Sequence, residues 1–402
     1  MEAILILPQA LSIMSYFKKI VRFILQSIKF SFFYTFTRHW KYSSTGLLII
    51  RNDHLGDLLV SLPSIKQAAD FVHNKSQKIT VIVSPAGYEI LKECPYIDNL
   101  EVVKKDDFTS GIIRKLKAFR KITKYRAKKT VLLLSLGRSG EHDYAALLPK
   151  SKERYVLETA YAWKIMDKIQ KYREIFFNLF YTKTVAYDIN KTLRENEAAL
   201  LSEALKVKIS PETGNVDFID YQKINPVIET PFYIVVPGAS NFTRQWPAKY
   251  FALIIDHISA NYPKLTPVIS GSTADTDIAE AVKKYSSHPD KIINICGKSN
   301  IQMLFANIKS AEFIITNDTA PYHIAGIFEK KCFCIGGNWQ LGAFTPDPYY
   351  KSSIFINHDT QCKRCLEQCK NMINNRYGCL MQVTVEQVKN TIDFHIKGKY
   401  EL

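Results

Sequence analysis

Short apolar strand patterns alternate with helical patterns twice along the chain, and this alternation constrains the fold most. In the first run, strands are predicted at Gly46–Arg51, Ile79–Val83 and Lys129–Leu136. A second run starts at Phe232–Val236, after a Pro-bounded connection over Asp220–Pro231. Two successive runs of strand–helix units predict an α/β fold with two doubly wound parallel sheets and a cleft between them.

Length and composition favour two folded halves. A chain of 402 residues is too long for one ordinary core, and its 47% hydrophobic residues can fill two. We expect a basic N-terminal segment over residues 1–45, a first domain over 46–225, and a second domain over 226–402 that carries a cysteine-rich tail. Within the first domain, the stretch from about Tyr155 to Leu205 is predicted to be helical.

The stretch Phe313–Asn338 (FIITNDTAPYHIAGIFEKKCFCIGGN) predicts a strand, a tight loop, a short helix and a second strand. A strand that enters a helix through Asn-Asp-Thr offers N–H groups and a hydroxyl at the positive helix end, which suits an anion. In an open α/β sheet, ligands bind at the carboxyl ends of the strands, where this loop falls. The alternative is that Asn317 or Asp318 only caps the helix.

The charge is strongly basic, with 54 Lys and Arg against 38 Asp and Glu, a net +16. Such a balance suits a partner that carries phosphates, such as nucleic acid, an anionic membrane or a nucleotide-linked substrate. No basic motif interleaved with aromatic residues accompanies the charge, so nucleic acid is not expected as a partner.

Residues Tyr16–Phe36 predict an amphipathic helix on an anionic membrane surface. The apolar stripe of this helix consists of Phe17, Ile20, Val21, Ile24 and Ile28. Arg22 and Lys29 interrupt the apolar runs before they reach the length of a membrane span or the core of a cleavable signal. The alternative is a helix that packs on the body of the protein.

Several common motifs are absent from the sequence. It contains no G-x-G-x-x-G, G-x-x-x-x-G-K-[ST], G-x-S-x-G or H-E-x-x-H pattern. Dinucleotide oxidoreductases, ordinary P-loop enzymes, common serine hydrolases and zincins are therefore disfavoured.

Four motifs, in this order and at this spacing, resemble the heptosyltransferases of glycosyltransferase family 9. They are RNDHLGDLLVSLPSIKQ at Arg51–Gln67, VVPGASNFTRQWPAKYFALI at Val235–Ile254, VISGSTAD at Val268–Asp275 and TNDTAPYHIAG at Thr316–Gly326. The resemblance extends over residues 46 to about 395.

The resemblance implies a GT-B fold, with two Rossmann-like domains that face each other across a cleft. The N-terminal domain would take the acceptor and the C-terminal domain the nucleotide-sugar. The implied reaction is an inverting, metal-independent transfer of heptose from ADP-heptose to the inner core of lipopolysaccharide, with no cofactor. The enzyme would be cytoplasmic and peripheral on the inner face of the inner membrane. A different nucleotide-sugar or glycan acceptor on the same fold is the alternative.

The resemblance assigns the general base to Asp57, which follows Gly56 at the start of a predicted helix. The alternative is a first-turn carboxylate that only favours the helix dipole. His54 is a second candidate for the base. We assign His54, Gly56 and Arg138, the last from the polar loop GRSGEHD, to the acceptor side.

For the donor side, the resemblance places a cation at Arg244, where the family has a lysine. Arg keeps the charge and adds bidentate phosphate geometry, although an unpaired surface arginine is the alternative. Ser240 and Thr243 share its loop and offer hydroxyls, and Gly238 would let the backbone approach a ligand. Gly271, in the third motif, completes this part of the donor side.

The family's Asp-Thr-Gly corresponds to Asp318, Thr319 and Ala320, and His323 occupies its histidine position. Thr319 and the helix end would hold the diphosphate. Ala320 departs from the pattern, and it is tolerated only if the backbone there is right-handed rather than at positive φ. His323 is either a ligand contact or a buried helix histidine that fixes the loop.

Four of the eight cysteines cluster near the C-terminus, at Cys362, Cys365, Cys369 and Cys379. The first pair has zinc-like spacing, but the later spacing is irregular. A structural zinc, reduced thiols and disulfides all stay open. No metal is expected to be obligatory for the reaction.

Overall fold

The computed structural model describes residues 43–108, 111–133, 138–158, 168–212, 231–365 and 369–398, with single residues within 21–35, 214–228 and at 400. The predicted helix over Tyr16–Phe36 lies outside the described residues except for a few single positions, as does most of Asp220–Pro231. Among the helices of the described part, none is long and apolar enough to cross a membrane.

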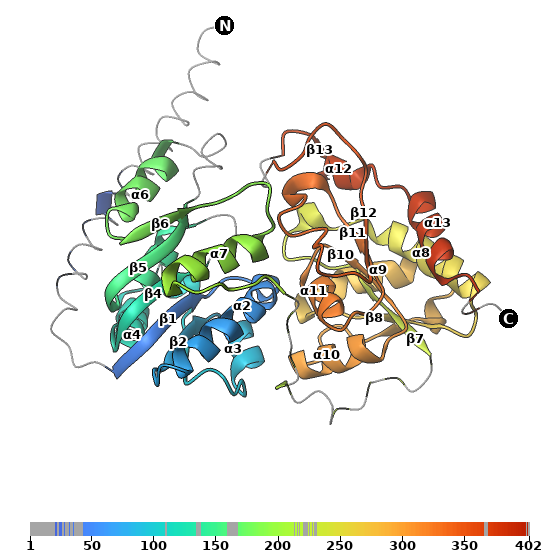
Figure 1. The fold of residues 1–402 in the computed structure, drawn as a ribbon. Helices are drawn as coiled ribbons and strands as arrows, with labels where there is room; N and C mark the ends of the chain where they lie inside the picture. The colour runs from blue at the N-terminus through green and yellow to red at the C-terminus, as the bar shows by residue number, and fades with distance from the viewer. Residues whose placement is uncertain are drawn as a thin grey trace, which may run out of the picture. The chain divides into compact units, whose positions relative to one another are not determined.

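The first sheet contains six parallel strands in the order β3-β2-β1-β4-β5-β6 (Figure 1). They are β1 (Ser43–Arg51), β2 (Ile79–Val83), β3 (Asn99–Val102), β4 (Tyr125–Leu132), β5 (Lys150–Glu158) and β6 (Lys183–Ala186). Leu48 of β1 lies opposite Thr80 of β2 and Thr130 of β4. From Leu47 to Ile50 the side chains are fully buried, as expected for a central parallel strand covered on both faces.

Helices of the first half pack on this sheet through apolar and aromatic side chains. They are α2 (Leu55–His73), α3 (Pro85–Leu91), α4 (Ile112–Thr123), α5 (Gly140–Leu147), α6 (Lys168–Asn178) and α7 (Leu193–Leu205). Phe119, Tyr144 and Phe177, from α4, α5 and α6, share one cluster with Leu48 and Ile50 of β1. The ring of Tyr144 lies 6.4 Å from Phe119 and 5.9 Å from Phe177, both edge to face, so these three helices share one core.

The second sheet repeats this order as β9-β8-β7-β10-β11-β12, again with parallel strands. They are β7 (Phe232–Val236), β8 (Thr266–Ile269), β9 (Ile293–Asn294), β10 (Ile314–Asn317), β11 (Cys332–Ile335) and β12 (Ser353–Ile356). In such a sheet the strand order reverses between the two central strands, and ligands bind there at the carboxyl ends. The reversal lies between β1 and β4 and between β7 and β10. The predicted α/β class with two doubly wound sheets is confirmed.

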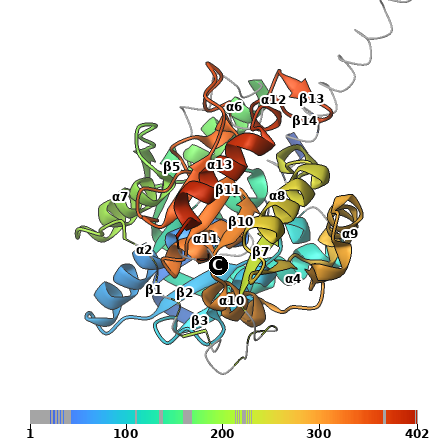
Figure 2. The ribbon, with the colours of Figure 1, turned by 90° about the vertical axis from the view of Figure 1, so that its right-hand side faces the viewer.

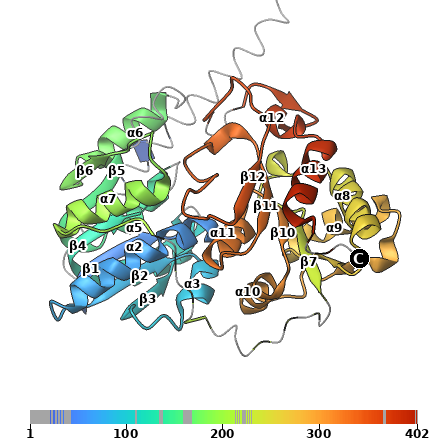
Figure 3. The same cartoon turned by 45° about the vertical axis from the view of Figure 1, so that its right-hand side comes forward.

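Helices cover both faces of the second sheet. They are α8 (Ala248–Asn261), α9 (Thr276–Tyr285), α10 (Ile301–Ser310), α11 (Ala320–Ile327), α12 (Gly378–Met381) and α13 (Val385–Ile396), with a small β13 (Met372–Ile373) and β14 (Arg376–Tyr377) hairpin. Figure 2 shows α8, α9 and α13 on one face, where Phe251, Val282 and Ile392 join the core of the sheet. Figure 3 shows α11 on the opposite face.

By their contacts, the residues form two compact units that do not follow a single cut in the chain. The second unit contains Pro211–Leu402 together with Leu55–Pro63 and Ile189–Glu195. The remaining segments of the first half form the first unit. The first turns of α2 and α7 thus belong with the second sheet. In α2 the division falls after Pro63, which has no N–H to donate to the Leu59 carbonyl.

The prediction that the stretch from about Tyr155 to Leu205 is helical is wrong in two places, where the structure has strands. Tyr155–Glu158 belongs to β5, and Lys183–Ala186 forms β6. The strand signal is weak because β5 begins with the charged sequence KSKER and β6 is a partly exposed edge strand. The strand predicted at Lys129–Leu136 is observed as β4, which starts earlier, at Tyr125.

We expect Gly326→Ala to destabilise the second unit by about 1–3 kcal/mol, because α11 packs closely on a loop. A Cβ atom at position 326 would lie 2.2 Å from Cγ of Tyr350, which is closer than van der Waals contact allows. Urea unfolding measures the change. Gly111→Ala is the control, because a Cβ there meets no heavy atom within 4 Å. Equal free energies of unfolding for the two variants would contradict this packing.

Candidate active site

The turn that carries Asp57 touches the loop that enters α11. A Cβ at Gly56 would lie 2.9 Å from Cδ2 of His323 and 3.8 Å from the Cα of Ala320. Gly56, Asp57, Ala320 and His323 all belong to the second unit. Asp57 is 8% exposed and lies in the first turn of α2. Two motifs about 260 residues apart in the sequence therefore meet at two helix N-termini, and only a glycine fits at the contact.

The loop from β10 to α11 keeps its hydroxyl groups close to the helix start. Thr319 is the N-cap of α11, and its side chain does not cap the helix. Its Oγ1 donates to the Asn317 carbonyl at 3.3 Å and lies 3.2 Å from Oγ1 of Thr316. Ala320 is the first residue of the helix and is not among the residues with positive φ. The alanine is therefore compatible with this backbone.

Asp318 points into the protein rather than to solvent. Its side chain is buried, and burial raises the pKa of the carboxyl, against the opposing effects of Arg244 and a hydrogen bond from Thr345. The interaction with Arg244 brings the second and fourth motifs together electrostatically. Asp318 therefore orients this loop through buried contacts.

Asn317 connects the loop after β7 to the loop after β10 and was not among the predicted site residues. Its side chain is fully buried, and its Oδ1 accepts from the Trp246 N–H at 3.0 Å. Its Nδ2 donates to the Pro237 carbonyl at 2.7 Å. The loop that carries Arg244 is thereby fixed to the end of β10. The sequence signal was present, since an asparagine at the end of a buried strand needs partners for its amide.

The side chain of Asp275 explains why glycine is needed at positions 238 and 271. A Cβ at Gly238 would lie 2.0 Å from Asp275 Oδ1, and a Cβ at Gly271 would lie 2.8 Å from Asp275 Cβ. Asp275 also accepts from the backbone N–H and hydroxyl of Ser272, at 2.8 and 2.7 Å. The space at both glycines is filled by this side chain, so they allow close packing of loops.

The loop after β7 presents the predicted donor-side cation. Arg244 ends a short 3-10 helix (Phe242–Arg244), and its guanidinium lies 5.9 Å from the Trp339 ring. Ser240 is exposed on the same loop. Oγ1 of Thr243 is buried and has no hydrogen-bond partner among the described residues.

His323 is buried and uncharged in this environment. It is 4% exposed, and burial, with a smaller effect of Arg194, lowers the pKa of the imidazole to about 3. The ring contacts Tyr322 and Tyr350 edge to face, with centroids 5.1 and 5.8 Å away. Its Nδ1 has no partner among the described residues. His323 therefore fixes the loop as a neutral helix histidine and keeps one nitrogen unused.

The two remaining acceptor-side residues lie in the first unit. His54 is exposed at the N-cap of α2. Arg138 is buried, and its guanidinium forms an ion pair with Asp143 at 2.6 Å and donates to the side chain of Asn178 at 2.6 Å. These partners bind Arg138 within the first unit.

The four C-terminal cysteines are partly buried. Within the described residues, no three His, Cys, Asp or Glu side chains are arranged to hold a metal ion. Burial raises the pKa of Cys365 to about 12, and Cys379 accepts from the Asn338 N–H at 3.3 Å. All four cysteines are free, and the structural zinc at Cys362, Cys365, Cys369 and Cys379 stays a prediction.

Comparisons with known proteins agree with this architecture. The family model described as glycosyltransferase family 9 (heptosyltransferase) matches residues 147–374, more than half of the chain. Lipooligosaccharide heptosyltransferase 2 of Campylobacter jejuni is 23% identical over 330 residues, which cover 78% of this chain and 94% of that protein.

Solved structures show the same fold. A glycosyl transferase family 9 structure from Veillonella parvula has a TM-score of 0.66 at 17% identity and covers 89% of this chain and 98% of its own. The structure of E. coli heptosyltransferase WaaC with ADP has a TM-score of 0.62 at 13% identity, with coverage of 88% and 99%. The resemblance seen in the four motifs and the GT-B fold class are confirmed.

The buried imidazole of His323 predicts how the stability of the protein depends on pH. An unfolded histidine titrates near 6.5 and His323 near 3, so below pH 6.5 the unfolded chain takes up a proton that the folded protein does not. Stability is therefore lost as pH falls, by about 2 kcal/mol at pH 5. We expect His323→Gln to remove this contribution to the loss of stability between pH 7 and pH 5. Urea unfolding at both pH values measures the free energy of unfolding. His288→Gln, at an exposed histidine, is the control and should show the same loss of stability as the wild type. If His323→Gln shows the full loss as well, His323 is not its source.

Proposed function

Because this chain belongs to glycosyltransferase family 9, the heptosyltransferases, we propose that it transfers a heptose from ADP-heptose to the inner core of lipopolysaccharide. The E. coli enzyme WaaC, which shares the fold, was solved with ADP, and this supports adenine as the base of the donor. The relative from Campylobacter jejuni is a lipooligosaccharide heptosyltransferase, which supports a lipid-linked core as the acceptor.

The contact of Gly56 with Ala320 and His323 carries the proposal. It brings a carboxylate, Asp57, beside the N-terminus of α11, where backbone N–H groups and the Thr319 hydroxyl favour a diphosphate. The base must lie near the anomeric carbon of the donor sugar, because the acceptor oxygen attacks this carbon as the diphosphate departs. These two groups would supply the base and the diphosphate site of a glycosyl transfer.

In the proposed reaction, Asp57 takes the proton of the acceptor hydroxyl as its oxygen attacks the anomeric carbon. The bond from that carbon to the β-phosphate oxygen breaks, and ADP leaves with the bonding pair. A single displacement from the opposite face inverts the configuration. No covalent intermediate with the protein is needed.

Negative charge that develops on the departing ADP requires a fixed cation, and Arg244 is the residue we assign to it. Its guanidinium lies beside Trp339 and interacts with Asp318, so its position is set before the donor binds. Thr243 adds a hydroxyl without a protein partner among the described residues. With a permanent protein cation at this place, the proposed step requires neither a metal nor a cofactor.

The basic charge of the chain supports a glycolipid acceptor at a membrane surface. The net charge of +16 favours an anionic lipid acceptor and an anionic bilayer over a neutral partner. We therefore propose a peripheral enzyme on the cytoplasmic face of the inner membrane, and we assign no role in nucleic-acid binding.

The base assignment is tested by Asp57→Asn, which keeps the shape of the side chain and removes its basicity. We expect kcat to fall about 10²–10⁴-fold, with ADP binding unchanged in calorimetry. The assay follows ADP release from ADP-heptose with heptose-deficient lipopolysaccharide as the acceptor. Glu93→Gln, at an exposed carboxylate, is the control and should keep wild-type activity. A variant at 57 with most of its rate would remove Asp57 from the mechanism.

The donor assignment is tested by thermal shift. ADP should raise the melting temperature of the protein more than UDP or GDP at equal concentration. Arg244→Met should abolish most of this shift and lower kcat/KM about 10²–10³-fold, whereas Arg244→Lys should retain part of both. Lys249→Met, at an exposed cation on α8, should behave as wild type. An unchanged ADP shift in Arg244→Met would contradict the assignment.

A further inference from the structure

Arg194 is a fully buried cation to which neither the sequence motifs nor the reaction assigns a role. It lies in the first turn of α7, in the segment that belongs to the second unit. The start of this helix is rigid, because the Thr192 hydroxyl and the Glu195 carboxylate cap each other's backbone N–H groups, at 3.3 and 2.7 Å. A buried cation on a rigid backbone needs ion-pair and hydrogen-bond partners that are already in position.

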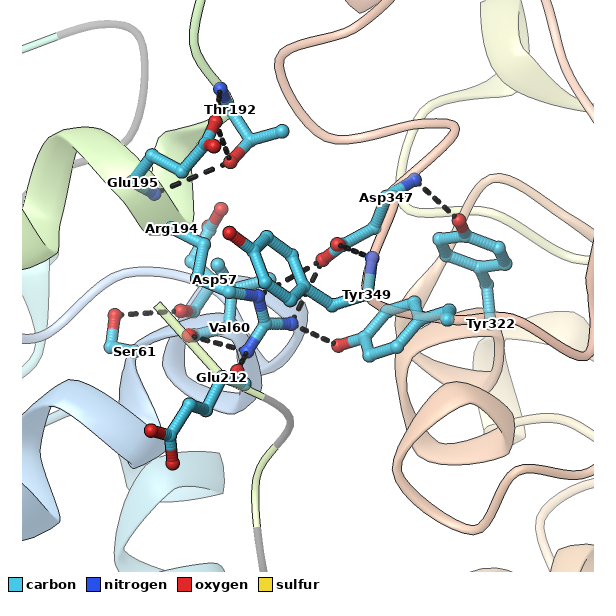
Figure 4. A network of polar contacts seen from close by, with 11 residues as sticks. Asp57, Val60, Ser61, Thr192, Arg194, Glu195, Glu212, Tyr322, Asp347 and Tyr349 are labelled. Carbon is cyan, nitrogen blue, oxygen red and sulfur yellow. Dashed lines mark hydrogen bonds and ion pairs between the residues drawn. The ribbon is translucent and has the colours of Figure 1, made fainter. Parts of the chain in front are cut away.

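The guanidinium of Arg194 contacts four residues from three separate segments of the second unit (Figure 4). It donates to Asp347 Oδ2 at 2.8 and 3.2 Å and to the Tyr350 hydroxyl at 2.8 Å. It also donates to the backbone carbonyl of Val60 at 3.3 Å and to that of Glu212. Although burial alone would lower the pKa of Arg194, Tyr350 and Asp347 raise it, so the charge is permanent.

One arm of this network reaches the proposed base. Val60 lies one turn after Asp57 in α2, and the Ser61 hydroxyl donates to the Asp57 carbonyl at 3.0 Å (Figure 4). Pro63 leaves the Leu59 carbonyl without its helical donor, so the rest of α2 holds this turn less firmly. A contact from outside the helix is therefore needed to fix the turn.

The other arm reaches the helix that would hold the diphosphate. The Tyr350 ring fills the space above Gly326 of α11. The Tyr322 hydroxyl of the same helix accepts from the Asp347 N–H at 2.9 Å (Figure 4). In addition, the Leu193 N–H donates to the Ala343 carbonyl at 2.8 Å. The same residues that bind the Arg194 guanidinium thus pack against α11.

We infer that Arg194 is a positioning residue that fixes the carboxylate of Asp57 relative to the N-terminus of α11, without contact to the substrate. This inference rests on the proposed function, since it gives Arg194 a task only if Asp57 acts as the base. Only arginine has enough donors in one plane to bind two side chains and two backbone carbonyls together, and lysine cannot replace it in full. The base and the donor site are then parts of one unit.

The test compares Arg194→Met and Arg194→Lys with the wild type in kcat, donor KM, ADP affinity and melting temperature. We expect kcat to fall about 10–100-fold in Arg194→Met and less in Arg194→Lys, because a base displaced by about 1 Å loses its reaction geometry. ADP affinity and donor KM should change less than about twofold, because Arg244 and Thr319 are untouched.

Two further variants separate positioning from loss of folding. Arg154→Met removes another buried arginine, in the first unit, and should lower the melting temperature without lowering kcat. Tyr350→Phe removes a single hydroxyl from the network and should lower kcat with the fold intact. If Arg194→Met does not fold, an unchanged kcat in Tyr350→Phe overturns the inference.

A double-mutant cycle distinguishes this inference from the proposed function. In an Asp57→Asn background, Arg194→Met should reduce the residual rate no further, because the group that it positions is gone. Independent, multiplicative losses would overturn the positioning role. If Asp57→Asn is inactive and Arg194→Met keeps the wild-type kcat, the inference fails and the proposed function stands. If Asp57→Asn keeps its rate, Asp57 is not the base, and the inference about Arg194 is overturned together with that assignment.

Discussion

The contact of Gly56 with His323 is the constraint on which the candidate site depends. A side chain at position 56 would overlap the imidazole, so glycine is required for the first turn of α2 to reach the first turn of α11. Both helices then present the positive ends of their dipoles near the same place, which favours an anion there. Because His323 is neutral and buried, it provides a fixed, uncharged surface for this contact.

Buried polar side chains hold this contact in place. Asn317 fixes the loop of Arg244 to the end of β10, and Asp275 fills the space beside two glycines. Arg194 joins α2 and α11, through the Val60 carbonyl on one side and through Asp347 and Tyr350 on the other. Removal of one partner from such a buried ion pair costs about 3–5 kcal/mol, because the other charge is left without compensation. Buried polar side chains inside the motifs, such as Asn317 and Asp275, and one outside them, Arg194, thus determine the geometry of the site.

The strand–helix alternation, and with it the two sheets, could be predicted from the sequence, because apolar runs such as Leu47–Ile50 mark buried strands. The motif order indicated the family and the loops at the strand ends. The strands β5 and β6 were missed because their residues are charged or partly exposed. Arg194 could not be found from the sequence. Its partners Val60, Glu212 and Asp347 lie far apart along the chain, and only the fold brings them together.

A crystal structure of the protein with ADP would test the central claim most directly. The account predicts that the diphosphate contacts Thr319, the N–H groups at the start of α11 and the guanidinium of Arg244, with the carboxylate of Asp57 facing the β-phosphate. A diphosphate bound away from α11, or an Asp57 side chain turned away from it, would contradict the account.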